Sequence, residues 1–248
     1  MKKLFILLFV VATFSMAGYS QPTYHFDVDG DGMVTASDIT TLYDHLLGIT
    51  PSFSTHEYVD LGLPSGTLWA TMNIGAANPE GYGYYFAWGE TYPRNIYSWD
   101  NYMWCNGSSS SLTKYCTQFP YGLVDDVTQL YPEDDAATAY WGPDWRMPTY
   151  AQIQELTANC SSEWTERNGI YGRLFTSNIN GATLFFPAAG YHSSVGFEAG
   201  TSGYYHSCEI PNSVPQKAYN LKVSENSGQS NSSFRFQGNS VRAVRAQN

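Results

Sequence analysis

The sequence predicts an α+β fold with short antiparallel strands and few helices, preceded by a separate loop-helix module. From residue 57 onward the chain is rich in Tyr, Trp, Gly and Ser, and short apolar runs alternate with turn signals. One segment in this region, residues 150–159, has the capping and periodicity of a helix. Many short strands with an isolated helix are typical of an antiparallel sheet that carries its helices on one face or end.

The first 20 residues have the pattern of a secretory signal peptide. Lys2 and Lys3 precede an apolar stretch over residues 4–14, and small or polar residues follow up to Ser20. Cleavage is expected after Ser20 or after Ala17. The apolar stretch is too short to span a bilayer, and no later segment is apolar for long enough. The sequence therefore predicts an exported protein, secreted or at the cell surface, without membrane insertion.

The acidic composition narrows the range of expected partners. The chain has a formal net charge of −10 at pH 7. Nucleic acids and anionic membrane surfaces attract clustered cations, so neither is expected as a partner. The residues that follow the signal peptide are enough for one small module and one domain with a sizeable core.

Residues 27–38 carry the pattern of a calcium-binding loop. Aspartates occupy loop positions 1, 3, 5 and 12, and a glycine occupies the turn at position 6. Position 7 offers a backbone carbonyl, and the threonine at position 9 offers its hydroxyl or a bound water. Calcium takes six to eight oxygen ligands, so one calcium ion is the expected cofactor. The expected ligands are Asp27, Asp29, Asp31, Met33, Thr35 and Asp38.

An amphipathic helix is expected directly after this loop. Apolar residues recur at helical spacing from Ile39 to Leu47, and Gly48 and Pro51 end the run. A calcium loop with a following helix, without a preceding helix and with Asp at position 12, resembles a dockerin repeat. Dockerins are EF-hand-like units by which polysaccharide-degrading enzymes dock onto cohesin domains. Dockerins normally carry two repeats, whereas residues 21–50 carry one. Two alternatives are therefore open for the module: it binds a cohesin-like partner, or it buries its apolar face on the second domain or on another chain.

Several strands and helix starts are expected in the second region. Asn180-Gly181 predicts a hairpin because both residues tolerate positive φ. Thr149 and Gln152 form a capping box that predicts the helix over residues 150–159. Asp134 and Asp135 are interpreted as a helix cap in preference to an ion site. The expected strands are residues 58–61, 67–73, 82–88, 173–177, 182–186, 218–223, 233–236 and 240–245.

Six short motifs occur in order between residues 57 and 246. They are EYVDLGLPSG at 57–66 with LWA at 68–70, YYFAWGE at 84–90, DDAA at 134–137, WRMPT at 145–149, PAAGY at 187–191 and SVRAVR at 240–245. Together they resemble the Fibrobacter succinogenes major paralogous domain, which is similar to C-type-lectin-like domains. The resemblance implies a C-type-lectin-like fold over residues 57–246. Met72 and His206 stand where that family often has Cys and Trp.

The abundant aromatic residues suggest sugar stacking, because a flat ring complements the C–H face of a pyranose. Trp69, Trp88 and Trp145 lie inside the motifs and are expected in the core. The better ligand candidates lie in polar, loop-like segments. They are Trp99, Trp104, Tyr204 and Tyr205.

No catalytic constellation emerges from the sequence. His192 and His206 have no nucleophile motif near them, and the sugar-calcium tripeptides of true C-type lectins are absent. The four cysteines match no zinc motif, and three pairings or free thiols are open. We therefore expect an exported, non-catalytic, calcium-binding protein that binds or adheres to an extracellular glycan or protein in polysaccharide utilisation. The alternatives are a glycan-active enzyme on the same fold and a structural cell-surface protein.

Overall fold

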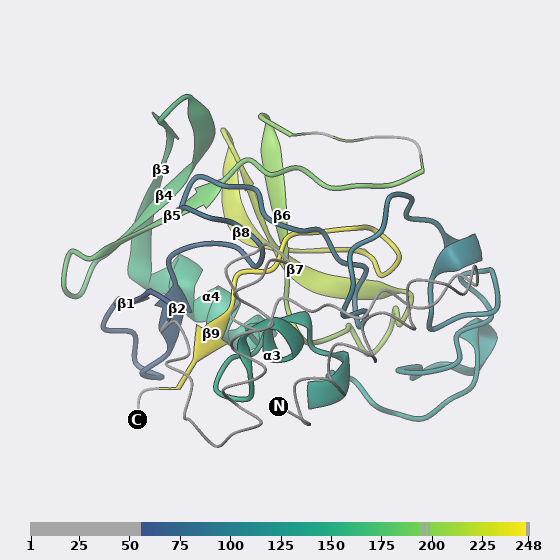
Figure 1. Cartoon of the computed structure of the whole chain (residues 1–248). Helices are drawn as coiled ribbons and strands as arrows, with labels where there is room; N and C mark the ends of the chain where they lie inside the picture. Colours follow the sequence, from purple (N-terminus) through teal and green to yellow (C-terminus); the bar gives the residue numbers. More distant parts are fainter. Residues whose placement is uncertain (1–55, 195–196, 198, 247–248) are drawn as a thin grey trace, which may run out of the picture.

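The computed structural model describes residues 56–194, 197 and 199–246, which form a mostly β fold with three small antiparallel sheets and two α-helices (Figure 1). The expected signal peptide, the expected module at residues 21–50 and all six expected calcium ligands lie outside the described residues. Among the described helices, none has the length and apolarity needed to cross a bilayer.

The first sheet joins the two ends of the described domain. It has the order β1 (Tyr58–Asp60), β2 (Leu68–Ala70), β9 (Val244–Arg245). In the register, Val59 lies opposite Trp69, and Trp69 lies opposite Val244. The expected strand at residues 58–61 is thus confirmed over its first three residues, the one at 67–73 is shortened to Leu68–Ala70, and the one at 240–245 is shortened to Val244–Arg245.

The second sheet is a meander of β3 (Cys160–Arg167), β4 (Ile170–Ser177) and β5 (Thr183–Pro187). Asn168 and Gly169 connect β3 to β4 with φ of 50° and 82°, as a two-residue type I′ turn requires. The expected hairpin at Asn180-Gly181 is confirmed between β4 and β5, although only Gly181 takes a positive φ.

The third sheet contains β6 (Ser202–His206), β7 (Lys217–Ser224) and β8 (Ser227–Phe234). Strands β7 and β8 pair over their full length, from Lys217 opposite Phe234 to Ser224 opposite Ser227. Helix α4 packs against β7 and β8 and leads directly into β3, so it links the second sheet to the third (Figure 1).

Both helices begin at the residues that the sequence indicates. Helix α4 (Tyr150–Asn159) has the complete capping box, with Thr149 Oγ1 accepting from Gln152 N at 3.2 Å. Helix α3 (Ala136–Trp141) is capped by Asp135, whose carboxylate accepts from Ala137 N and Thr138 N. The same carboxylate accepts from Met147 N at 2.9 Å, so it also fixes the segment that leads to α4. The interpretation of this acidic pair as a cap is confirmed for Asp135.

The expected strand at residues 82–88 is wrong. This segment contributes one isolated antiparallel bridge, between Phe86 and Asn239. Gly83 and Gly89 have φ of 68° and 79°, which interrupts the extended conformation at both ends of the apolar run. Trp88 is fully buried and its indole N–H donates to Ser207 O at 2.8 Å, so the run is apolar because it lies in the core.

Three clusters of buried residues form the interior. The expected core positions Trp69, Trp88 and Trp145 are confirmed, with exposed fractions of at most 4%. Trp88 and Trp145 belong to one cluster with α3, and Trp69 belongs to a second cluster under α4. The third cluster is smaller and consists of loop residues around Tyr97 and Tyr102.

Candidate ligand-binding surface

The four predicted ligand residues fall in different places. Trp99 begins a short 3-10 helix, Trp99–Asn101, and with Trp104 it packs against the third core cluster. Tyr204 and Tyr205 are neighbours on β6, so they point to opposite faces of the sheet. The structure therefore brings two of the four together.

Tyr205 is removed from the set of ligand candidates. Its side chain is 1% exposed, it belongs to the second core cluster, and its hydroxyl donates to Pro187 O. A ring without an exposed face cannot stack on a ligand. Tyr204 is half-buried, packs edge-on against Tyr191 at 5.3 Å between ring centroids, and has Lys222 Nζ 5.5 Å from its ring centroid.

The contacts of Trp104 indicate a structural role for its ring. Its indole N–H donates to Gly89 O at 2.7 Å, and Lys114 Nζ lies 4.6 Å from its ring centroid. Lys114 also makes an ion pair with Asp134 at 2.5 Å. These contacts fix the position of the Trp104 ring.

Trp99 lies beside two phenylalanines that the sequence reasoning missed. The rings of Phe234 and Phe236 are stacked, with centroids 5.9 Å apart and planes 16° apart. The Trp99 ring centroid lies 6.1 Å from that of Phe234 and 5.0 Å from that of Phe236. Phe234 is 40% exposed, although a phenylalanine ring gains free energy by burial.

His192 and Phe197 extend this group along the surface. The backbones of His192 and Gly238 exchange two hydrogen bonds, of 2.8 and 2.9 Å, which places His192 beside the turn that carries Phe236. The His192 ring stacks on Phe197 at 4.3 Å between centroids, and Phe197 is 50% exposed. A Cβ at Gly238 would come within 2.6 Å of the Tyr97 ring, so only glycine allows this approach. We call Trp99, Phe234, Phe236, His192 and Phe197 the aromatic surface.

Arg235 anchors the turn that carries the two phenylalanines. It lies between them in the chain and is fully buried, and the turn is closed by Gln237 N, which donates to Phe234 O at 3.0 Å. Its guanidinium donates to Tyr102 Oη at 2.8 Å, to Tyr115 O at 3.0 Å and to Lys114 O at 3.1 Å.

Further contacts of Arg235 complete this anchor. The guanidinium donates to Pro215 O at 3.2 Å, and its carbon lies 4.8 Å from the ring centroid of Trp88. A buried cation with several hydrogen bonds and an aromatic ring beside it is fixed in position. The turn from Phe234 to Phe236 is therefore rigid before any ligand arrives.

The charge around the aromatic surface is low and mixed. Lys217 Nζ lies 5.5 Å from the Phe234 ring centroid, and Asp100 is exposed next to Trp99. Glu90 and Arg94 neutralise each other in an ion pair of 2.5 Å. Burial lowers the pKa of His192, so this ring is neutral at pH 7 and adds to the apolar character of the surface. The surface suits a neutral ligand with apolar faces.

The described residues contain no group of three or more His, Cys, Asp or Glu placed to hold a metal ion. All four cysteines are free thiols, which is one of the alternatives that the sequence left open. Burial raises the pKa of Cys160 to about 11 and that of Cys208 to about 12, so both are protonated at neutral pH. His206 is fully buried and bonded to Phe86 O, as expected of a core histidine.

Two hollows lie away from the predicted ligand residues. One of about 240 Å³ has Tyr150, Glu209 and Tyr219 in its wall. Glu209 accepts from Tyr150 N at 2.6 Å, so its carboxylate is engaged at the start of α4. The other hollow, of about 450 Å³, has Glu80 and Asn168 in its wall.

Comparison of the chain with protein-family models, with curated proteins and with solved structures gave no match in any of the three cases.

Proposed function

We propose that this protein is an exported, non-catalytic, calcium-binding protein whose C-terminal domain binds an extracellular glycan through the aromatic surface. The observation that carries the proposal is the pre-oriented set of rings around Phe234, in which Phe234 and Phe197 are exposed, the other three rings are half-buried, and buried Arg235 holds the turn. Rigid aromatic rings supply contact area at a low entropic cost, and their faces match the C–H face of a pyranose.

The proposal also includes a C-type-lectin-like fold for the C-terminal domain and a calcium-binding repeat at the N-terminus. A C-type-lectin-like fold is supported by the six ordered motifs and by a terminal sheet in which β1 and β9 both pair with β2. The 21–50 module is proposed to be a dockerin-type repeat that binds one calcium ion. The set of loop aspartates at alternating positions supports that assignment. Association with polysaccharide utilisation and a place outside the cell are supported by the dockerin resemblance and by the signal-peptide pattern of residues 1–20.

The ligand test uses the mature full-length chain and a panel of immobilised neutral and acidic polysaccharides, followed by titration with the best soluble binder. Trp99→Ala and Phe234→Ala are each expected to weaken binding by about 1 to 3 kcal/mol, because each removes a ring that contacts the sugar. Binding is expected to persist in EDTA, since the aromatic surface contains no calcium ligand set.

Phe119→Ala is the matched control for this test. Phe119 is 87% exposed and lies in a different 3-10 helix, Phe119–Tyr121, outside the aromatic surface. Its replacement is expected to leave the affinity unchanged. Equal affinity in all three variants, or loss of binding in EDTA, would place recognition elsewhere. Release of reducing sugar from the panel would favour the enzyme alternative.

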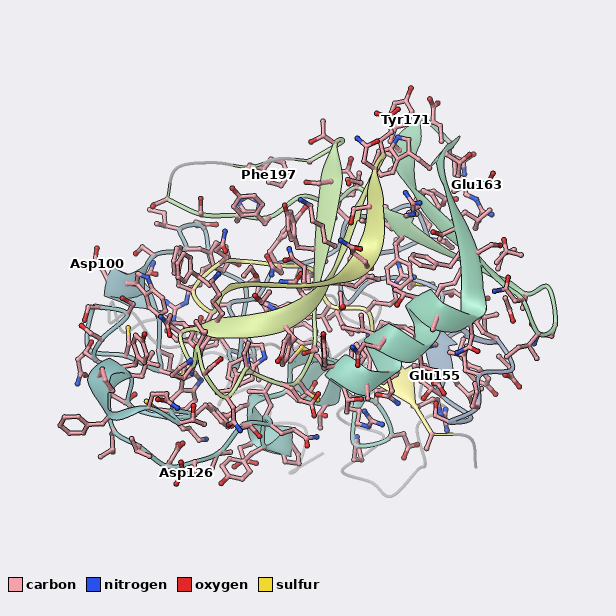
Figure 2. The ribbon with its side chains drawn as sticks, turned by 180° about the vertical axis from the view of Figure 1, so that it is seen from behind. Asp100, Asp126, Glu155, Glu163, Tyr171 and Phe197 are labelled. Atoms are coloured by element: carbon pink, nitrogen blue, oxygen red, sulfur yellow. The ribbon has the colours of Figure 1, made fainter. Side chains whose placement is uncertain are left out.

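Calcium binding is tested separately by calorimetry on the mature chain. One ion is expected per chain, with binding lost in Asp27→Ala and in Asp38→Ala because each removes a carboxylate ligand. Asp126→Ala serves as the control, since Asp126 is an exposed aspartate of the C-terminal domain (Figure 2). An unchanged stoichiometry in both loop variants would refute the assignment of this loop.

A further inference from the structure

A separate pair of aromatic rings, one exposed and one half-buried, lies on the β3–β4 hairpin. The rings of Trp164 on β3 and Tyr171 on β4 are nearly parallel, with 5° between planes and 6.2 Å between centroids. Tyr171 is 48% exposed and Trp164 is half-buried. Figure 2 shows Tyr171 at the opposite end of the molecule from Asp100, which adjoins Trp99. The pair is therefore separate from the aromatic surface.

Packing of the described core does not account for this pair. Trp164 is the one tryptophan that neither belongs to nor packs against any of the three core clusters of the described residues. Tyr171 is also outside all three. Large aromatic side chains stabilise a fold mainly by burying apolar area, which this pair does only in part. The other six tryptophans, each in or against a cluster, are Trp69, Trp88, Trp99, Trp104, Trp141 and Trp145.

The strand register places two charged residues on the same face as the rings. Trp164 lies opposite Arg173, and Glu166 lies opposite Tyr171. Alternate residues of a strand share a face, so these four form one block at the end of the hairpin. Nearer the base of the hairpin the same face carries Phe175, which is fully buried. The face therefore runs out of the core and opens towards solvent at its tip.

Arg173 is fixed in place by oxygen atoms that carry no charge. Its Nε donates to Ser162 Oγ at 2.8 Å, and Nη1 donates to Ser224 O at 2.8 Å and to Glu225 O at 3.2 Å. A Cβ at Gly228 would come within 2.4 Å of Nε, so β8 lies directly against the guanidinium. The fixed position of Arg173 gives its neighbour Trp164 a rigid support.

We propose that this block of Trp164, Glu166, Tyr171 and Arg173 is a second carbohydrate-contact site, which takes a pyranose of a neutral polysaccharide. One positive and one negative group beside the rings give the block no net charge, which favours an uncharged ligand over an anionic or cationic one. A sugar presents apolar C–H groups to the rings and hydroxyls to the guanidinium and the carboxylate. The site is independent of the aromatic surface in its residues and in its location.

Affinity electrophoresis of the mature chain tests this site, with soluble β-glucan, xylan and galactomannan as neutral probes and polygalacturonate as the acidic probe. The wild-type protein is expected to be retarded by at least one neutral probe. Trp164→Ala and Tyr171→Ala are each expected to weaken that retardation by at least fivefold. Phe119→Ala, at a more exposed ring outside the hairpin, is expected to behave as wild type. Unchanged melting temperatures would show that both hairpin variants are folded.

The outcomes separate this site from the aromatic surface. If Trp99→Ala and Phe234→Ala abolish retardation while the hairpin variants retain it, the proposed function stands and this inference is wrong. The reverse result supports the hairpin site and excludes the aromatic surface as the glycan-binding site. Retardation by polygalacturonate alone, no retardation by any probe, or a dimer in sedimentation that Trp164→Ala dissociates would each overturn the assignment.

Discussion

Replacing Arg235 by methionine is expected to lower the free energy of unfolding by about 3 to 5 kcal/mol. Methionine keeps most of the length of the side chain but offers no donor. Tyr102 Oη and the carbonyls of residues 114, 115 and 215 would lose their hydrogen bonds in a fully buried site. Each buried acceptor left without a donor costs about 1 to 3 kcal/mol, and relief of the desolvated cation offsets part of the sum.

Denaturant unfolding of Arg235→Met beside wild type measures this effect. Lys222→Met is the control, because Lys222 is a partly exposed cation that also lies over a tyrosine ring, and a change below about 0.5 kcal/mol is expected there. The folded fraction of Arg235→Met is also expected to bind glycan more weakly, since Phe234 and Phe236 lose their orientation. Unfolding midpoints that coincide for Arg235→Met and wild type would show that this guanidinium is not the anchor.

The sequence predicts best those elements that are specified by residues close together in the chain. Helix α4 begins at Thr149 because the capping box is local, and α3 begins after Asp135 for the same reason. Strand β3 was missed because its exposed positions make it read as polar. The signal for it is present in Asn168-Gly169, since both residues take the positive φ of a two-residue type I′ turn between β3 and β4, whereas Asn180-Gly181 lies in a longer loop.

The candidate site was predicted only in part, because burial depends on contacts distant in sequence. The polar segment around Trp99 predicts a ligand contact, and Trp99 lies in the aromatic surface. The same reasoning predicts Tyr204 and Tyr205 as a pair, yet neighbours in a strand face opposite sides of the sheet, and Tyr205 faces inward. Phe234 and Phe236 flank an arginine in a segment, residues 233–236, that is expected as a strand, but β8 ends at Phe234 and the chain turns at Arg235 and Phe236. Only the carbonyls of remote loops make Arg235 an interior residue.

The stability difference between wild type and His206→Gln is expected to change by about 3 kcal/mol between pH 7 and pH 4. Burial lowers the pKa of His206 from 6.5 to about 4. Its Nε2 lies 3.0 Å from Phe86 O and Nδ1 lies 3.4 Å from Asn239 Nδ2, so the neutral ring with its proton on Nε2 satisfies both partners. A second proton would face the Asn239 amide N–H group inside the core.

The sign follows from which state binds the proton. Between pH 6.5 and 4 the unfolded chain protonates His206 while the folded chain does not, so this stabilisation is complete above pH 6.5 and is lost as pH falls towards 4. Asp135 acts in the opposite direction, because burial raises its pKa to about 6 and the folded state then gains stability below that pH. The pH dependence of the free energy of unfolding of wild type therefore contains two opposing contributions, one from His206 and one from Asp135.

Comparison with His206→Gln removes the contribution of Asp135, which both proteins share. Denaturant unfolding at half-unit steps from pH 7 to pH 4 is the measurement. Below pH 6.5 the free energy of unfolding of the variant is expected to rise steadily relative to that of wild type. Asp135→Asn is the complementary variant, and its difference from wild type is expected to change in the opposite sense below pH 6. If the difference in the free energy of unfolding between wild type and His206→Gln stays constant across this range, His206 has the same pKa in the folded and unfolded states. That result would contradict the assignment of a buried, neutral His206.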